Sequence, residues 1–309
     1  MKILQSIADF RPDGRYLAVV LGNFDGVHLG HAELIRQAEN QAQKKNGLLM
    51  LLSFWPHPLS LLGGTAPPLL TDRAEKYRLA EGLGVDYFLE LPFSKSLAAK
   101  TPKQFIEEYP AHGLAANLLA VGFNFRFGAG GAGDVAALRA LAAGFGIETL
   151  ILPPFQLGGK PVSSSRIRSL LAAGELRAAN RLLGHSFSLG GRVVEGNRLG
   201  RTLGFPTANI EVAPYMQLPA YGVYAARAQI NGAELPAVVN IGLKPTVGDF
   251  TVPTVEAHLP GFNGNLYGAE MRLNFVAEIR GERKFAGLPA LKKQIAADAE
   301  RALAILSAK

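Results

Sequence analysis

The chain has 309 residues, of which 48% are hydrophobic and 18% are charged, and it contains no cysteine. Its length is about twice that of a ~150-residue domain, so we expect two domains with separate cores. The lack of cysteine excludes disulfides and thiolate metal sites. No stretch approaches the ~18 apolar residues of a membrane span, and the first strong apolar run, residues 17–21, is preceded by Asp9 and Asp13 and by no small-residue cleavage site. The sequence therefore predicts a cytoplasmic protein with no membrane partner.

The net charge of +7 is spread over both halves of the chain, and no basic run exceeds two residues, the length of Lys292-Lys293. Proteins that bind nucleic acids usually concentrate positive charge on one face or arm. Small phosphorylated ligands explain the excess as well as RNA does, so we expect no nucleic acid partner.

The first half alternates apolar runs of strand length with segments of helical periodicity. The expected strands cover residues 17–21, 48–54, 85–91, 118–123 and 147–152. The expected helices cover residues 31–45, 71–82, 101–109 and 134–143, and Thr71, Thr101 and Asp134 are candidate caps or first-turn residues. Near-continuous apolar strands between helices are typical of a parallel sheet covered on both faces, which places ligands at the carboxyl ends of the strands.

Two further helices, 165–173 and 175–183, precede a change of pattern at Gly184. Short runs with alternation or β-branching then cover residues 192–194, 223–230, 235–241, 254–259 and 271–279. This half is expected to form a small antiparallel barrel closed by an amphipathic helix over 288–306. We therefore predict an α/β chain with domains at 1–184 and 185–309.

The segment that follows the first strand reads GNFDGVHLGH over residues 22–31. His28 and His31 lie where a helix begins, and the free N–H groups and dipole of a helix start attract anions. Imidazole donors there could stabilise charge on a phosphate during transfer. Two alternatives remain: cap or surface histidines, and a zinc pair, which lacks an obvious third ligand.

Two other segments of the first half suggest phosphate chemistry. Residues 163–168 read SSSRIR, three hydroxyls at a helix start among cations, which suits a polyphosphate tail, although taken alone such a segment is more often an ordinary N-cap. Residues 128–133 fit G-x-G-x-x-G ahead of a helix, with Glu148 downstream. The preceding strand ends near Phe123, well before this segment, and Glu148 lies at the start of the next strand instead of its end. A flexible phosphate-side loop is therefore favoured over a dinucleotide site.

The second half carries a Gly-rich segment, GRVVEGNRLGR over 191–201, which leads to Pro206-Thr207-Ala208-Asn209. Glycines let backbone N–H groups approach phosphates, and Thr207 and Asn209 offer oxygen ligands that magnesium accepts. An ordinary Gly-rich turn is the alternative. Over 254–259 the alternation places Thr254, Glu256 and His258 on one strand face, where a carboxylate is either a site residue or solvated surface.

These segments, with FWPHP over 54–58 and VGFNFRFG over 121–128, resemble in order the adenylyltransferase module of bacterial bifunctional riboflavin kinase/FAD synthetases. The resemblance implies that His28 and His31 stabilise the α-phosphate transition state and that Ser164, Ser165 and Arg168 grip pyrophosphate. It also implies ATP contacts at Gly22, Phe24 and Gly30, and a flavin side formed by Pro56, His57, Pro58 and Asn124. Gly131 stands in a loop where relatives often carry Lys or Arg.

Residues 185–309 resemble the family's riboflavin kinase module through the Gly-rich segment, Pro206 to Asn209, Asn240 to Gly242, Pro245-Thr246, Glu256, Leu266 to Gly268 and Arg280 to Phe285. The resemblance implies a six-stranded Greek-key barrel in which Thr207 and Asn209 hold Mg-ATP and Glu256 is the general base. It further implies phosphate contacts at Gly196, Gly200 and Arg201, and flavin contacts at Arg280 and Phe285.

The function expected from this resemblance is phosphorylation of riboflavin to FMN by the second half and adenylylation of FMN to FAD by the first. The ligands would be ATP with Mg²⁺, riboflavin, FMN and FAD, and a homo-oligomer stays open. Two alternatives are a chain with one active module and a non-catalytic nucleotide- or RNA-binding protein. Intact His28, His31 and Glu256 argue against the second.

Overall fold

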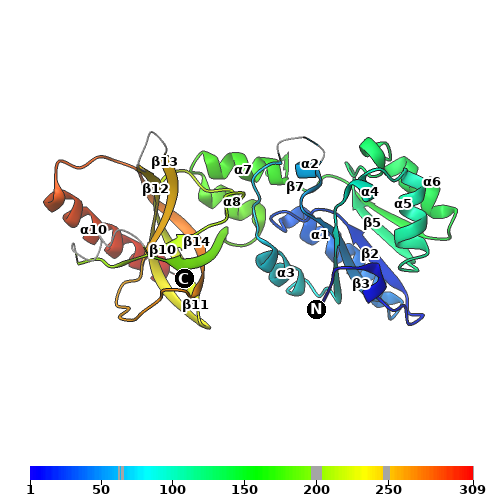
Figure 1. Ribbon diagram of the computed structural model, residues 1–309, viewed down its shortest axis with the longest axis horizontal. Helices are drawn as coiled ribbons and strands as arrows, with labels where there is room; N and C mark the ends of the chain where they lie inside the picture. The colour runs from blue at the N-terminus through cyan, green and yellow to red at the C-terminus, as the bar shows by residue number, and fades with distance from the viewer. Residues whose placement is uncertain (62, 64–65, 196–203, 246–250, 309) are drawn as a thin grey trace. The chain divides into compact units, whose positions relative to one another are not determined.

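The structure, a computed structural model, describes residues 1–61, 63, 66–195, 204–245 and 251–308. It divides into two compact units (Figure 1). The first unit comprises Met1–Pro67 and Arg73–Ser163, and the second comprises Pro68–Asp72 and Ser164 onward. The helical segment before Gly184 therefore groups with the second unit, whereas the sequence places it in the first domain.

The first unit is built on a six-stranded parallel sheet in the order β1-β4-β3-β2-β5-β6. The strands are β1 (Lys2–Leu4), β2 (Leu17–Leu21), β3 (Leu48–Trp55), β4 (Tyr87–Pro92), β5 (Leu118–Gly122) and β6 (Glu148–Leu152). Five of them match the expected strands, and the sixth, β1, has only three residues and no recognisable pattern. The chain leaves β2 toward β3 and later returns to its other side at β5, so the order reverses beside β2. Such a switch point is where sheets of this class bind ligands.

Helices connect these strands. They are α1 (Leu29–Lys44), α2 (Pro58–Leu61), α3 (Arg73–Glu81), α4 (Lys95–Ala98), α5 (Pro102–Ile106) and α6 (Val135–Ala143). The side chains of Thr101 and Asp134 cap α5 and α6 as predicted, because each accepts backbone N–H groups of the first turn. Thr71 lies two positions before α3, which begins at Arg73. Two short strands, β7 (Gln156–Leu157) and β8 (Lys160–Pro161), form a hairpin after β6.

Both faces of the parallel sheet are buried. Along β2, Leu17, Val19 and Leu21 belong to one hydrophobic cluster, and Ala18 and Val20 belong to another on the opposite face. A sheet covered on both faces exposes its functional groups only at the strand ends. The loops after β2, β3 and β5 are therefore the places for a site in this unit.

The second unit contains α7 (Ser164–Ala172), α8 (Leu176–Leu183) and a closed barrel in the order β10-β13-β12-β11-β14-β9. The strands are β9 (Ser188–Val194), β10 (Thr207–Glu211), β11 (Gly222–Ile230), β12 (Ala233–Pro245), β13 (Thr251–His258) and β14 (Glu270–Gly281). All neighbouring strands are antiparallel. The barrel confirms the expected fold class.

The last helix, α10 (Leu288–Ser307), packs on the barrel (Figure 1). Its Ala302 and Leu306 join Val223 and Ile279 in one buried cluster. The short segment 68–72 also belongs to this unit: Leu69 donates its N–H to the Tyr215 carbonyl at 2.7 Å and accepts from Gln217 at 2.8 Å. Among the described residues, no helix is long and apolar enough to cross a membrane.

Candidate active sites

The first candidate site lies at the end of β2, where the chain turns sharply before α1. Phe24, Gly26 and Val27 have positive φ angles, and Phe24 is fully buried. A Cβ added at Gly22 would lie 3.1 Å from the Phe24 ring, so glycine gives this ring its space. The Phe24 ring in turn meets His31 edge to face, with 5.5 Å between ring centroids. The turn therefore packs the Phe24 ring against His31, one of the two predicted histidines.

His28 and His31 are brought together at the first turn of α1. His28 is the N-cap of the helix, and its Nδ1 atom accepts the backbone N–H of His31 at 3.3 Å. The two rings stack with centroids 3.7 Å apart and planes inclined by 11°. A Cβ at Gly30 would lie 3.2 Å from the His28 ring, so the glycine between the histidines allows this packing. Because Nδ1 of His28 is an acceptor, the proton of its neutral ring lies on Nε2.

The histidine pair lies in a low-dielectric setting. His28 is 6% exposed, and the Nδ1 atom of His31 is fully buried with no hydrogen-bond partner in the described structure. Burial, supported by the charges of His28 and Lys76, holds the pKa of His31 well below its ordinary value of 6.5. His31 is therefore an uncharged imidazole at neutral pH. A neutral ring that donates one N–H can stabilise developing negative charge without first losing a proton.

The motif itself did not identify Lys76, although it belongs to a predicted helix. This lysine of α3 is 5% exposed, and burial lowers its pKa while Glu90 and Asp25 act in the opposite direction. Glu90, at the end of β4, is 2% exposed and accepts hydrogen bonds from Arg73 Nε at 2.6 Å and Tyr77 Oη at 2.7 Å. In the sequence, a lysine at a polar position of a helix looks like an ordinary surface residue. No local signal therefore predicts that Lys76 is buried.

The predicted flavin residues of the first unit lie on two loops, after β3 and after β5, and β2 lies between these two strands in the sheet. Pro56 to Pro58 follow β3, where His57 Nδ1 accepts the Leu59 N–H at 3.2 Å and His57 Nε2 lies 3.4 Å from Asn23 Nδ2. This contact joins the loops after β2 and β3. Asn124 is exposed after β5, next to Phe123, whose side chain is 48% exposed. An exposed phenylalanine at a sheet end is a stacking surface that the sequence did not single out.

The Gly128 to Gly133 segment forms a tight loop between β5 and α6. Gly128, Gly130 and Gly131 have positive φ, and a Cβ at Gly128 would lie 2.7 Å from Pro102. These conformations explain the glycines by backbone geometry alone. The phosphate-side role of the loop stays a prediction.

Ser164, Ser165 and Arg168 lie on the first turns of α7, in the second unit. Arg168 donates from Nε to the Pro68 carbonyl at 2.7 Å, so part of its guanidinium anchors the segment 68–72. The serine hydroxyls and the histidine pair thus belong to different units of the structure.

The second candidate site lies on β10, β12 and β13. Glu256 is directly opposite Asn209 on one side and Asn240 on the other. Thr207 lies opposite His258 in the same register. Val255 and Ala257 are buried, whereas Thr254, Glu256 and His258 are partly exposed, as the alternation predicts. The barrel therefore places two predicted oxygen ligands and the predicted base on adjoining strands.

Next to Thr207 is a pocket of about 440 Å³. Its wall includes Pro206, Phe262 and Tyr267, the last from the expected Leu266 to Gly268 motif. Two aromatic rings and a threonine suit a flat ring with a polar tail. The predicted phosphate residues Gly196, Gly200 and Arg201 lie outside the described residues.

Arg280 and Phe285 join the barrel to α10. Arg280 donates from Nε to Asp298 Oδ2 at 3.0 Å, and its guanidinium lies 5.4 Å from the centre of the Phe285 ring. Asp298 is 3% exposed and also accepts from Gln294 Nε2 at 2.6 Å. The two predicted flavin residues thus form one network that anchors the last helix.

Among the described residues, no three histidine or carboxylate side chains lie close enough together to hold a metal ion. Thr207 and Asn209 provide neutral oxygens on one strand face. Mg²⁺ typically uses one or two protein ligands and completes its shell with substrate phosphates and water. The donor set therefore fits a metal that arrives with a nucleotide.

Comparison with known proteins matches both units. The FAD synthetase family model matches residues 11–166, and the riboflavin kinase family model matches residues 183–306. The bifunctional riboflavin kinase/FMN adenylyltransferase of Escherichia coli strain K12 is 40% identical over 282 residues, covering 91% of this chain and 90% of the relative. The bifunctional riboflavin kinase/FMN adenylyltransferase of Bacillus subtilis is 36% identical over 293 residues, covering 94% of this chain and 92% of the relative.

A solved structure is also similar over the whole chain. The crystal structure titled a macrolide-efflux protein from Streptococcus pneumoniae superposes with a TM-score of 0.87 and 30% identity, covering 97% of this chain and 98% of that one.

Proposed function

The chain belongs to the family of bifunctional riboflavin kinases/FMN adenylyltransferases, and we propose how its residues divide the two reactions. It is a transferase that phosphorylates riboflavin to FMN with ATP and adenylylates FMN to FAD with release of pyrophosphate. Both reactions use ATP, generally with a divalent metal. The observation that carries the first assignment is the stacked histidine pair at the switch point of the sheet.

In the adenylyl transfer, an FMN phosphate oxygen attacks the α-phosphorus of ATP while the bond from that phosphorus to the bridging oxygen of pyrophosphate breaks. His28 and His31 donate to the α-phosphate oxygens, where negative charge accumulates. Gly22, Phe24 and Gly30 shape the turn against which the nucleotide binds. Ser164, Ser165 and Arg168 hold the departing pyrophosphate by charge-assisted hydrogen bonds.

The flavin of FMN binds beside Pro56, His57, Pro58 and Asn124. The contact between His57 and Asn23 supports this placement because it brings the β3 loop to the histidine turn. Exposed Phe123 adds an aromatic face on which a flat ring can stack.

In the kinase reaction, the oxygen of the ribityl 5′-hydroxyl bonds to the γ-phosphorus of ATP, and ADP leaves. Glu256 accepts the proton of that hydroxyl. Thr207 and Asn209 would hold Mg²⁺ together with the ATP phosphates, and the metal would supply positive charge that offsets theirs. The register of Glu256 against Asn209 supports this division because base and metal ligand share one strand pair. Arg280 and Phe285 contact the flavin, and Gly196, Gly200 and Arg201 contact the ATP phosphates.

We place the functional domains at 1–184 and 185–309 and the protein in the cytoplasm, which the lack of cysteine supports. Its partners are the small molecules named above, without nucleic acid or membrane.

The assay that tests this function incubates purified protein with riboflavin, ATP and Mg²⁺ and resolves the flavins by chromatography. We expect riboflavin to pass to FMN and then to FAD. Formation of FMN without FAD would show that only the kinase module is active. If neither FMN nor FAD forms, the protein is a non-catalytic binder. Replacing Mg²⁺ by EDTA should stop both steps.

A further inference from the structure

Four side chains share one face of the strand pair formed by β10 and β13, and the two reactions above assign no role to one of them, His258. In the antiparallel register Asn209 lies opposite Glu256, and Thr207 lies opposite His258. Residues two apart on a strand lie on the same face, so these four positions form one patch. All four are partly exposed. His258 is therefore a direct neighbour of the proposed metal ligands and the proposed base.

The ring of His258 is hydrogen-bonded to the backbone immediately before Thr207. Its Nδ1 atom lies 2.9 Å from the carbonyl oxygen of Pro206. A carbonyl oxygen can only accept a hydrogen bond, so Nδ1 of His258 carries a proton and donates it. The two residues are 52 positions apart in the sequence, and strand pairing brings them together.

The same ring contacts the residue before Pro206. Phe205 meets His258 edge to face, with 5.5 Å between ring centroids and planes inclined by 81°. This is a favourable geometry for two aromatic rings. Pro206 itself is exposed, so burial in the core does not fix its position. His258 thus holds both residues that lead into β10, one through its ring and the other through its N–H.

Pro206 stands where the pairing of β10 with β13 ends. The strand begins at Thr207, whose cross-strand partner is His258. Proline has no N–H, so its carbonyl is the only backbone group with which it can form a hydrogen bond. A peptide unit is planar from one Cα to the next, so the Pro206 carbonyl oxygen and the Thr207 Cα share one plane. The atom that His258 holds therefore sets the orientation from which the Thr207 side chain starts.

We infer that His258 is a positioning residue of the kinase reaction: its Nδ1–H holds the peptide between Pro206 and Thr207 so that the Thr207 hydroxyl is oriented for the divalent metal that accompanies ATP. The inference rests on the proposed role of Thr207 as a metal ligand. Mg²⁺ demands near-ideal octahedral geometry, so a ligand oxygen with a poorly fixed backbone binds it less well. His258 acts through the backbone and touches neither metal nor substrate.

The test separates the N–H of His258 from its ring. His258→Phe keeps an aromatic ring against Phe205 and removes the donor. His258→Asn removes the ring and places an amide N–H close to the position of Nδ1. Thr207→Ala removes the proposed metal ligand and defines the effect that His258→Phe should reproduce. His112→Phe, the same substitution at an exposed histidine of the first unit, is the matched control.

Isothermal titration calorimetry gives the Kd of ADP for each full-length protein, once with Mg²⁺ and once with EDTA. The ratio of the two Kd values is the gain in affinity that the metal provides. The part of this gain that Thr207→Ala removes belongs to the kinase site, although both units bind nucleotide. We expect His258→Phe to lower the gain by about fivefold, the scale of one hydrogen bond, with Kd in EDTA within about twofold of the wild type. His258→Asn should retain most of the gain, and His112→Phe all of it.

The kinetics of FMN formation give a second readout. In His258→Phe the KM for Mg²⁺ at fixed ATP should rise by about fivefold, while the KM for riboflavin stays within about twofold. His258→Asn should restore the KM for Mg²⁺ toward the wild-type value. FAD formation from supplied FMN should be unchanged in both variants, because Thr207 and His258 belong to the second unit.

Nitrogen-15 NMR of histidine-labelled wild type tests the inference without any variant, since Nδ1 of His258 should carry a proton. An unprotonated Nδ1 would overturn the inference. It would also be overturned if Thr207→Ala lowers the gain from Mg²⁺ and a folded His258→Phe protein keeps the wild-type gain. If Thr207→Ala itself leaves the gain unchanged, the proposed role of Thr207 as a metal ligand is wrong, and the inference about His258 is wrong with it.

Discussion

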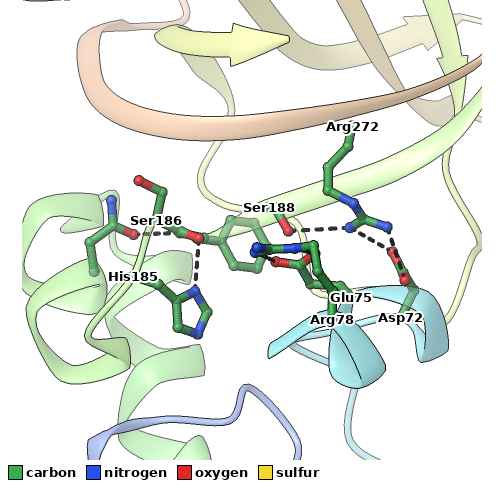
Figure 2. Close-up of polar contacts among 9 residues, drawn as sticks. Asp72, Glu75, Arg78, His185, Ser186, Ser188 and Arg272 are labelled. Atoms are coloured by element: carbon green, nitrogen blue, oxygen red, sulfur yellow. Dashed lines mark hydrogen bonds and ion pairs between the residues drawn. The ribbon is translucent and has the colours of Figure 1, made fainter. Parts of the chain in front are cut away.

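Arg272 of β14 and Asp72, two hundred positions earlier in the chain, form a two-pronged ion pair with N···O distances of 3.0 and 3.1 Å (Figure 2). Arg272 also donates to Ser188 Oγ at 3.3 Å. The pair joins the segment 68–72, which the chain contributes between two elements of the first unit, to the barrel of the second. The barrel unit is therefore built from two separate stretches of sequence.

We expect Asp72→Asn to lower the free energy of unfolding of the second unit by about 1–2 kcal/mol. Both side chains are about four-fifths buried, at 17% and 21% exposure, so the loss should lie between those of exposed and fully buried pairs. Urea unfolding measures it. Asp13→Asn, in an exposed pair with Arg15, is the control and should change little. If both substitutions lower the free energy of unfolding equally, the Asp72–Arg272 pair stabilises the protein no more than an exposed ion pair does.

His28→Ala should lower FAD formation from FMN by about 10²- to 10³-fold, the usual cost of removing one donor to a transition-state charge. Loss of the His28 side chain also removes the cap on the His31 backbone N–H. FMN formation from riboflavin in the same sample should stay close to normal. Chromatography of both flavins gives the two rates at once, and near-normal FAD synthesis would remove His28 from the mechanism.

Glu256→Gln keeps the size of the side chain but cannot take a proton. If Glu256 is the base, FMN formation should fall by about 10²- to 10⁴-fold while supplied FMN is still converted to FAD. Glu211→Gln, at the exposed end of β10, is the matched control and should leave both rates unchanged. A fall of less than about tenfold would make Glu256 an orienting residue, because loose phosphoryl transfer needs a base less.

A fragment of residues 185–309 should fold and form FMN, and a fragment of residues 164–309 should do so with a higher Tm, by roughly 5–10 °C. The longer fragment retains Asn180, which donates to the Phe275 carbonyl at 2.9 Å and accepts the Phe187 N–H at 2.8 Å. Each such hydrogen bond contributes about 1 kcal/mol. Thermal unfolding followed by circular dichroism makes the comparison. A short fragment that folds but forms no FMN would place part of the kinase site before residue 185.

The first unit should lose stability as pH falls below about 6.5. His31 stays uncharged when folded because its pKa is depressed, but it gains a proton when unfolded, so the unfolded state binds more protons. Between pH 7.5 and 5.5 this difference lowers the free energy of unfolding by about 1 kcal/mol. Urea unfolding of wild type and His31→Gln measures it, and the variant should lack this part of the pH dependence. His112→Gln, at an exposed position, should retain it.

Local chemistry by itself predicted much of this protein. Helix and strand periods depend on neighbours within one turn or one pleat, so the order of elements and the class of both units followed from the sequence. The histidine pair was visible because both residues share one helix start. The face that holds Thr254, Glu256 and His258 was visible because side chains alternate along a strand.

Only the tertiary structure decided which distant residues meet. Sheet order brings Asn240 beside Glu256, and strand pairing of this kind leaves no trace in either segment alone. The burial of Lys76 depends on how α3 packs on the sheet. The ion pair of Asp72 with Arg272 depends on a five-residue segment that joins the other unit. The burial of a side chain sets how strongly its charge affects stability, and burial is a property of the packed chain.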